Sequence, residues 1–281
     1  MYKYLPPERI DVLINKIICF NNPHNFNDPF EFHALFEQGS LINNLENIIE
    51  GMNLFDQMDD EIKLIYSRLS QDKQKEISQQ FLPVMRSLVE KFKPTIINSA
   101  NQVYENFNEK FVDFTRVLCL SEKKDNLLMW GHYADSHRGF VLEFDVKNSF
   151  FNQRRTQEDD FGYLRKVNYK KDVDILDPVS GNLSRHFLSK NQDWEYESEW
   201  RMLLPAHQAN KKIEHSGLVF DLFSFPACMI KSVILGCKAT NEFEKIIMTV
   251  LKDDEEYSHV KLFKCHRSNE RYELIATPIE K

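Results

Sequence analysis

The segment FTRVLCLSEKKDNLLMWGHYADSHRGFVLEF, residues 114–144, carries the clearest succession of structural signals in the chain. Side chains alternate over residues 114–121, which predicts a β-strand. Residues 125–134 predict a short helix, with Asp125 as its N-cap. Gly139 then marks a turn into a second strand over residues 140–144. The segment therefore predicts a strand, a helix and a strand in succession.

Outside this segment, strands and helices continue to alternate irregularly. A short helix is expected to begin at Pro7, and another to cover residues 240–251. Few connections resemble βαβ units, which favours an α+β fold with mixed or antiparallel small sheets over a doubly wound α/β fold. The further predicted strands cover residues 2–4, 18–20, 167–169, 201–204, 233–235, 260–263 and 272–276.

A helical insertion is predicted at about residues 41–112, where apolar residues follow the helical period. Pro83 and Pro94 interrupt this stretch, so several helices are expected rather than one. No linker-like composition flanks the insertion. The sequence thus predicts a single α+β domain over residues 1–281, with a helical insertion.

The composition limits the classes of function. The formal charge is -7, and no long run of Lys or Arg indicates a nucleic-acid-binding face. The five cysteines are irregularly spaced, which predicts reduced thiols in a cytoplasmic protein. Neither a signal peptide nor an apolar run of the roughly 20 residues that would cross a membrane is recognisable.

The first motif is Phe26-Asn27-Asp28-Pro29-Phe30-Glu31. It places an amide and two carboxylates between aromatic rings. Asn and Asp side chains bond to nearby backbone groups, and proline fixes the chain, so a structural turn is one interpretation. A binding loop is the other, since loops often carry functional residues.

The second motif is Met129-Trp130-Gly131-His132-Tyr133-Ala134-Asp135. Its rings can stack on a flat ligand, and its histidine can carry charge. On a helix, Met129 and Tyr133 share a face and His132 lies beside them. The alternative is that Trp130 and Tyr133 are core aromatic residues.

The third motif is Trp194-Glu195-Tyr196-Glu197-Ser198-Glu199-Trp200-Arg201. If the segment is extended, Glu197, Glu199 and Arg201 point to one face. Arg201 would then keep one carboxylate ionised while the other acts. A charged surface strand is the alternative interpretation.

Other catalytic patterns are weak. The chain contains no Gly-rich phosphate loop, nucleophile elbow or zinc-protease helix motif. His132, Asp135 and His137 have no common metal-ligand spacing, so no metal is expected.

Six motifs occur here in one order: Tyr2-Lys3-Tyr4, Phe26 to Glu31, Cys119-Leu120-Ser121, Met129 to Asp135, Trp194 to Arg201 and Val233-Ile234-Leu235-Gly236. The set resembles a bacterial family known as domain of unknown function 2971, and the resemblance covers nearly the whole chain except residues 41–112. This resemblance implies no activity.

A looser resemblance is to ADP-ribosyltransferases of the toxin and tRNA phosphotransferase type. These enzymes carry a basic residue on an early strand, Ser, Thr or Tyr on a middle strand, and Glu on or before a late strand. Lys3, Ser121 and Glu199 occur here in that order, although Lys3 stands where those enzymes use Arg or His. The resemblance implies NAD as substrate, held in a cleft between two small sheets.

This resemblance also implies roles for individual residues. Glu199 would stabilise the positive charge that develops on the ribose, and Glu197 would take a proton from the acceptor. Tyr133 or Trp130 would stack on nicotinamide. The expected NAD-binding residues are Lys3, Tyr4, Asn27, Asp28, Ser121, Trp130, His132, Tyr133 and Arg201.

Three functions therefore stay open. The first is ADP-ribosyl transfer to an unknown protein or nucleic-acid acceptor, or NAD hydrolysis, in a toxin or antiphage effector. The second is a non-enzymatic module that binds a nucleotide or a peptide. The third is a metal-dependent hydrolase or nuclease that uses Asp28, Glu31, Glu197 and Glu199, because carboxylate clusters bind Mg²⁺.

Overall fold

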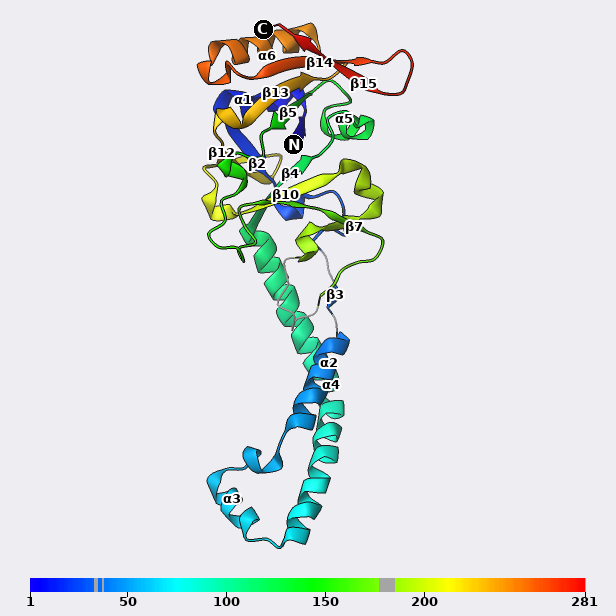
Figure 1. Cartoon of the computed structure of the whole chain (residues 1–281), viewed down its shortest axis with the longest axis vertical. Coiled ribbons are helices and arrows are strands. Elements are labelled where there is room, and N and C mark those ends of the chain that lie inside the picture. The colour runs from blue at the N-terminus through cyan, green and yellow to red at the C-terminus, as the bar shows by residue number, and fades with distance from the viewer. Residues whose placement is uncertain (33–34, 37, 177–184, 281) are drawn as a thin grey trace. The chain divides into compact units, whose positions relative to one another are not determined.

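The computed structural model describes residues 1–32, 35, 36, 38–176 and 185–280 (Figure 1). The chain divides into two compact units. The first comprises Met1–His33, Lys110–Val173 and Ser184–Lys281, and the second comprises Ala34–Glu109 and Asp174–Leu183. The predicted α+β class is confirmed. That the whole chain acts as a single domain stays a prediction.

An eight-stranded sheet forms the centre of the first unit. Neighbouring strands are antiparallel, except that β13 and β14 run parallel and are joined through helix α6 (Asn241–Asp253). This is the kind of mixed sheet that the sparse βαβ signals predicted. In spatial order the strands are β15 (Leu274–Ile279), β14 (Lys261–Arg267), β13 (Ile230–Leu235), β5 (Phe140–Phe144), β1 (Tyr2–Leu5), β4 (Thr115–Ser121), β10 (Glu199–Pro205) and β6 (Leu164–Lys166).

A three-stranded sheet and a two-stranded sheet complete this unit. One antiparallel sheet has the order β11 (Lys211–His215), β12 (Leu218–Ser224) and β2 (Ile17–Phe20). Strands β7 (Asn168–Lys170) and β9 (Ser189–Asn191) form a parallel pair. An isolated bridge between Asn21 and Val117 brings the end of β2 beside β4.

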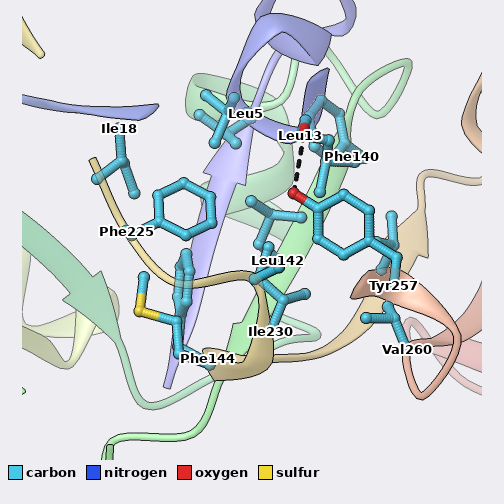
Figure 2. Packing of buried hydrophobic residues seen from close by; sticks show 14 of the residues in the cluster. Leu5, Leu13, Ile18, Phe140, Leu142, Phe144, Phe225, Ile230, Tyr257 and Val260 are labelled. Carbon is cyan, nitrogen blue, oxygen red and sulfur yellow. Dashed lines mark hydrogen bonds between the residues drawn. The ribbon is translucent and has the colours of Figure 1, made fainter. Parts of the chain in front are cut away.

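The main core lies between the eight-stranded sheet and the segments that cover it. Figure 2 shows Leu5, Phe140 and Leu142 from the central strands packed near Phe225 and Ile230. The hydroxyl of Tyr257 donates a 2.8 Å hydrogen bond to the carbonyl oxygen of Leu13, shown as the dashed line in Figure 2. Burial of these apolar side chains is the main stabilising term of the unit.

The helices of the first unit are α1 (Asp11–Asn15), α5 (Leu127–Tyr133) and α6. The predicted cap of α5 was wrong by one residue: Asn126, not Asp125, accepts hydrogen bonds from the backbone amides of Leu128 and Met129. An Asn amide can also donate, and Asn126 Nδ2 bonds the carbonyl oxygen of Tyr196. The cap therefore also ties α5 to the segment that carries Glu197.

Short 3₁₀-helices connect many of the helices and strands in both units. They are Pro7–Ile10, Pro23–Asn25, Leu54–Gln57, Ser149–Phe151, Arg185–Leu188, Gln192–Glu197, Ala206–Gln208, Ala227–Met229 and Glu255–Tyr257. All five cysteines are free; Cys19 and Cys265 are buried, Cys119 and Cys237 are half-buried, and Cys228 is exposed.

The second unit is mainly helical. It contains β3 (Leu35–Phe36) paired with β8 (Ile175–Leu176), α2 (Gln38–Gly51), α3 (Asp60–Ser67) and most of α4 (Gln71–Phe114). The stretch contains several helices, as predicted, but the breaks between them do not lie at the prolines: α4 continues through both Pro83 and Pro94. Each proline leaves one carbonyl, of Gln79 or Glu90, without its helical partner. Both of these residues are exposed, so water can bond to the carbonyls.

No helix among residues 1–32, 35, 36, 38–176 and 185–280 combines the length and the apolar character needed to cross a membrane.

Candidate functional site

A pocket of about 350 Å³ lies in the first unit, where strands β1 and β4 separate. These strands pair only at Tyr2 and Ser121. The volume lies at the lower end of the range for small-molecule sites, roughly 300–1,000 Å³. The lining residues are Tyr2, Lys3, Tyr4, Asn21, Asn25, Phe26, Asn27, Cys119, Leu120, Ser121, Met129, Tyr133, Lys190, Glu197 and Glu199.

The register of the central sheet aligns three lining residues in one row. Tyr2 on β1 pairs with Ser121 on β4, and Ser121 pairs with Glu199 on β10. The three strands are consecutive neighbours in the sheet. The N-terminal strand and the late acidic strand, far apart in sequence, thus contribute to one pocket.

Glu197 reaches the pocket from a turn, not from a strand. The extended arrangement considered for residues 194–201 does not hold for their first half, because Gln192–Glu197 forms a 3₁₀-helix and Ser198 has φ 46°. Ser121 Oγ donates a 2.6 Å hydrogen bond to the carbonyl oxygen of Glu197 and fixes this turn on β4. Strand β10 begins only at Glu199.

Along one part of the lining, two cations hold three carboxylates, of which Glu197 and Glu199 line the pocket. Lys190 Nζ lies 2.9 Å from Glu31 Oε1, 2.7 Å from Glu197 Oε2 and 3.4 Å from Glu199 Oε2. Lys190 enters this cluster from the short strand β9.

Arg201, which has no exposed surface, binds Glu199 with two nitrogens, at 2.8 Å and 2.9 Å. Its Nη2 also donates to Glu31 Oε1 at 2.6 Å, and its Nη1 to the carbonyl oxygen of Phe187 at 2.9 Å. Such a two-pronged contact fixes the orientation of the Glu199 carboxylate. Glu31, Lys190, Glu197, Glu199 and Arg201 are called the charge cluster below.

The two glutamates that line the pocket differ in acidity. Burial alone would raise the pKa of Glu199, but Arg201 and Lys190 outweigh burial and lower it to about 2. Burial raises the pKa of Glu197 above the ordinary 4.5; Lys190 opposes this shift and Glu199 reinforces it. The lowered pKa favours the ionised form of Glu199, and the raised pKa lets Glu197 bind a proton more readily than an ordinary carboxylate, a contrast typical of acid–base pairs.

The charge cluster is not neutral. With all groups ionised, its three carboxylates exceed its two cations by one negative charge. Burial alone would lower the pKa of Lys190, but Glu199, Glu31 and Glu197 raise it well above the ordinary lysine value. Because the cluster is buried, its excess negative charge is poorly screened and acts on charged groups in the pocket, among them the Lys3 ammonium group that lines it.

Several lining residues are aromatic. Tyr133 Oη donates a 2.6 Å hydrogen bond to Glu197 Oε1. Burial, followed by the charge of Glu197, raises the pKa of Tyr133 well above its ordinary value, so its hydroxyl keeps its proton. Tyr2, Tyr4 and Phe26 also line the pocket, which is suited to a flat ring.

A lysine completes the lining. Lys3 Nζ donates to the carbonyl oxygen of Cys119 at 3.0 Å. An ammonium group has three donors, and the other two remain available for an anionic group in the pocket.

Seven of the predicted site residues line the pocket: Lys3, Tyr4, Asn27, Ser121, Tyr133, Glu197 and Glu199. Arg201 lies behind it and bonds Glu199.

Three predicted site residues lie elsewhere. Trp130 is a core residue with no exposed surface, packed edge-on against Tyr4, so its faces are closed to a ligand. His132 is exposed and packs beside Tyr196. Asp28 is buried, and its Oδ1 accepts from the amide of Phe30, as in the structural turn that was the alternative interpretation.

Lys190 is the main residue that the sequence analysis missed. It stands in a short strand without a recognisable motif. The one available signal was charge balance, because Glu31, Glu197 and Glu199 cannot be buried around Arg201 alone without a second cation. That argument predicts a cation but not its position. Tyr2 was missed for a similar reason, since its place depends on strand register.

Residues 129–202 match the model of a family described as "Protein of unknown function (DUF2971)". The matched segment includes Tyr133, Lys190, Glu197, Glu199 and Arg201, and it supports the predicted resemblance to this family. No curated protein and no solved structure matches the chain.

Proposed function

We propose that this protein cleaves the bond between nicotinamide and ribose in NAD, as an ADP-ribosyltransferase or an NAD glycohydrolase. The observation that carries the proposal is the pair Glu197 and Glu199, two pocket-lining carboxylates of opposite pKa shift in a buried cluster with one excess negative charge. The neighbouring strands that carry Lys3, Ser121 and Glu199 give further support.

The charge of the pocket fits this chemistry. The nicotinamide ring of NAD is positively charged, and during cleavage that charge moves to the ribose C1′ as the ring departs with the bonding electron pair. A fixed carboxylate near C1′ stabilises the transition state more than the ground state. Glu199 is suited to this role because Arg201 holds it in place and keeps it ionised.

Glu197 is suited to proton transfer. A hydroxyl or amine that attacks C1′ must lose a proton, and a carboxylate with a raised pKa is a better base than an ordinary one. Tyr133 positions the acting oxygen through its 2.6 Å hydrogen bond to Oε1. Water as the attacking group gives ADP-ribose; a protein or nucleic-acid group gives an ADP-ribosylated acceptor.

The pocket dimensions fit one half of the dinucleotide. A volume of about 350 Å³ holds the nicotinamide riboside portion and leaves the adenosine half outside. Tyr2 and Tyr133 offer rings to nicotinamide, and Lys3 offers its free donors to a phosphate. A toxin or an antiphage effector is the biological role in which such an activity would serve.

The proposal is tested by incubating the purified protein with NAD or NADH and measuring nicotinamide release by chromatography. We expect release from NAD alone, because the uncharged ring of NADH would have to leave as an anion. Addition of EDTA is expected to leave the rate unchanged. Absence of release from NAD, with or without candidate acceptors, contradicts the proposal, and loss of the activity in EDTA favours the metal-dependent alternative.

A further inference from the structure

The second unit buries very little of its apolar surface. Among the residues of this unit whose side chains the structure describes, only Ile42, Ile49 and Tyr104 are buried. Helices in water depend on tertiary packing of an apolar face more than on intrinsic propensity. The side chains described in this unit thus do not form a sufficient core of their own.

A stripe of exposed apolar residues follows the N-terminal half of α4. Ile77, Val84 and Leu88 are 40%, 56% and 41% exposed, and Phe92, four residues further on, is 50% exposed. Spacings of seven and four residues place these side chains on one face, over about 22 Å of helix. This set of four residues is called the α4 stripe.

The exposed α4 stripe lies outside the contact between α4 and α2. Arg86 of α4 bonds Glu50 of α2 at 2.7 Å, and Val89 lies near Ile49 at the same junction. Arg86 and Val89 are displaced from Val84 by about half a turn of helix. The contact between α2 and α4 therefore leaves the stripe uncovered.

The exposed area is that of a protein interface. Twelve large apolar side chains described in this unit are between 39% and 68% exposed: Ile48, Phe55, Ile62, Leu64, Ile65, Ile77, Val84, Leu88, Phe92, Val103, Phe107 and Ile175. At roughly 85 Å² each, they expose about 1,000 Å², and a standard interface takes ~800 Å² from each partner. Single exposed apolar residues need no explanation, but a row of them on one helix face, such as the α4 stripe, indicates an interaction surface.

Two segments of the second unit carry opposite net charges. Residues 38–67, which contain α2 and α3, carry six carboxylates and one cation, a net charge of -5. Residues 71–93 of α4 carry five cations and three carboxylates, a net charge of +2. A two-fold axis beside the α4 stripe lets the basic α4 of one copy meet the acidic α2–α3 segment of the other.

We propose that the second unit is a homodimerisation module, in which two copies of this chain pair through the α4 stripe and the neighbouring apolar residues of α3. Two helical hairpins then share one core, as in a four-helix bundle. Two-fold homodimers are the commonest soluble oligomers, and their interface uses the same surface on both copies. This inference does not depend on the proposed function of the pocket.

Light scattering of the full chain after size-exclusion chromatography tests the proposal. The wild type is expected at twice the chain mass of 33.4 kDa, and the double substitution Val84→Lys with Leu88→Lys at the single-chain mass. The matched control is Gln79→Lys with Glu90→Gln, which adds the same charge at exposed positions on another face of α4 and is expected to stay dimeric. A monomeric wild type, or a dimeric stripe variant, overturns the proposal.

Thermal unfolding keeps the proposal testable if the stripe variant does not fold. The midpoint of the helical circular-dichroism transition of the wild type is expected to rise with protein concentration, because association stabilises the folded chain by mass action. Added salt is expected to lower the fraction of dimer, since complementary charges flank the stripe. A midpoint independent of concentration overturns the proposal as well.

Discussion

Replacing Glu197 with glutamine is expected to lower the rate of nicotinamide release by about 10²–10⁴-fold, the range for removal of a general base. Glutamine keeps the size of the side chain and can still accept a hydrogen bond from Tyr133. It leaves two carboxylates with the two cations of the charge cluster, so the fold is expected to persist. A lower rate of nicotinamide release would therefore reflect the missing general base and not a loss of the folded structure.

Glu195→Gln is the matched control for this substitution. Glu195 is an exposed glutamate of the same 3₁₀-helix, and its replacement is expected to leave the rate unchanged. Steady-state kinetics of both variants and the wild type give the comparison. Equal rates for Glu197→Gln and the wild type would remove Glu197 from the mechanism.

The same substitution has a signature in the pH profile. Burial raises the pKa of Glu197 above 4.5, and the base acts only when ionised. Wild-type activity is therefore expected to fall as the pH drops through this raised pKa, at a higher pH than an ordinary carboxyl group would give. The residual activity of Glu197→Gln is expected to lack this acid limb.

Replacing Arg201 with methionine is expected to lower the free energy of unfolding by about 3–5 kcal/mol, the range for removing one partner of a buried ion pair. Arg201 has no exposed surface and binds both Glu199 and Glu31. Without it, Lys190 alone faces three buried carboxylates. Methionine fills the space but leaves that excess charge unpaired.

Urea unfolding followed by tryptophan fluorescence measures this effect, because all three tryptophans, Trp130, Trp194 and Trp200, lie in the first unit. Arg138→Met is the control: its exposed pair with Asp135 is expected to contribute no more than about 1 kcal/mol. Arg201→Lys keeps the charge but not the two-pronged contact. Its loss in the free energy of unfolding is expected to lie between those of Arg138→Met and Arg201→Met. A loss of less than about 1 kcal/mol for Arg201→Met would show that the cluster does not hold the site together.

The sequence predicted local elements well wherever one strong signal determined them. The strand at residues 140–144 was correct at both ends, and the helix predicted at residues 240–251 is α6, which begins one residue later and has Thr240 as its N-cap. Errors arose where two signals competed. Asp125 and Asn126 are both good caps, and only tertiary contact with the carbonyl of Tyr196 distinguishes them.

The residues of the site were partly predictable, but their arrangement was not. Polar motifs indicated seven of the fifteen lining residues. The row of Tyr2, Ser121 and Glu199 depends on the register between strands that are far apart in the chain. Ser198 in a left-handed conformation converts an expected strand into a turn, and residue type alone does not predict this.

The most direct test of the proposed function is a crystal structure of the Glu197→Gln variant with NAD, which this variant is expected to bind without cleaving. The nicotinamide ring is predicted to lie in the pocket against Tyr2 or Tyr133, with the ribose C1′ facing residues 197 and 199. NAD bound elsewhere, or a pocket that stays empty at saturating NAD, would contradict the proposal.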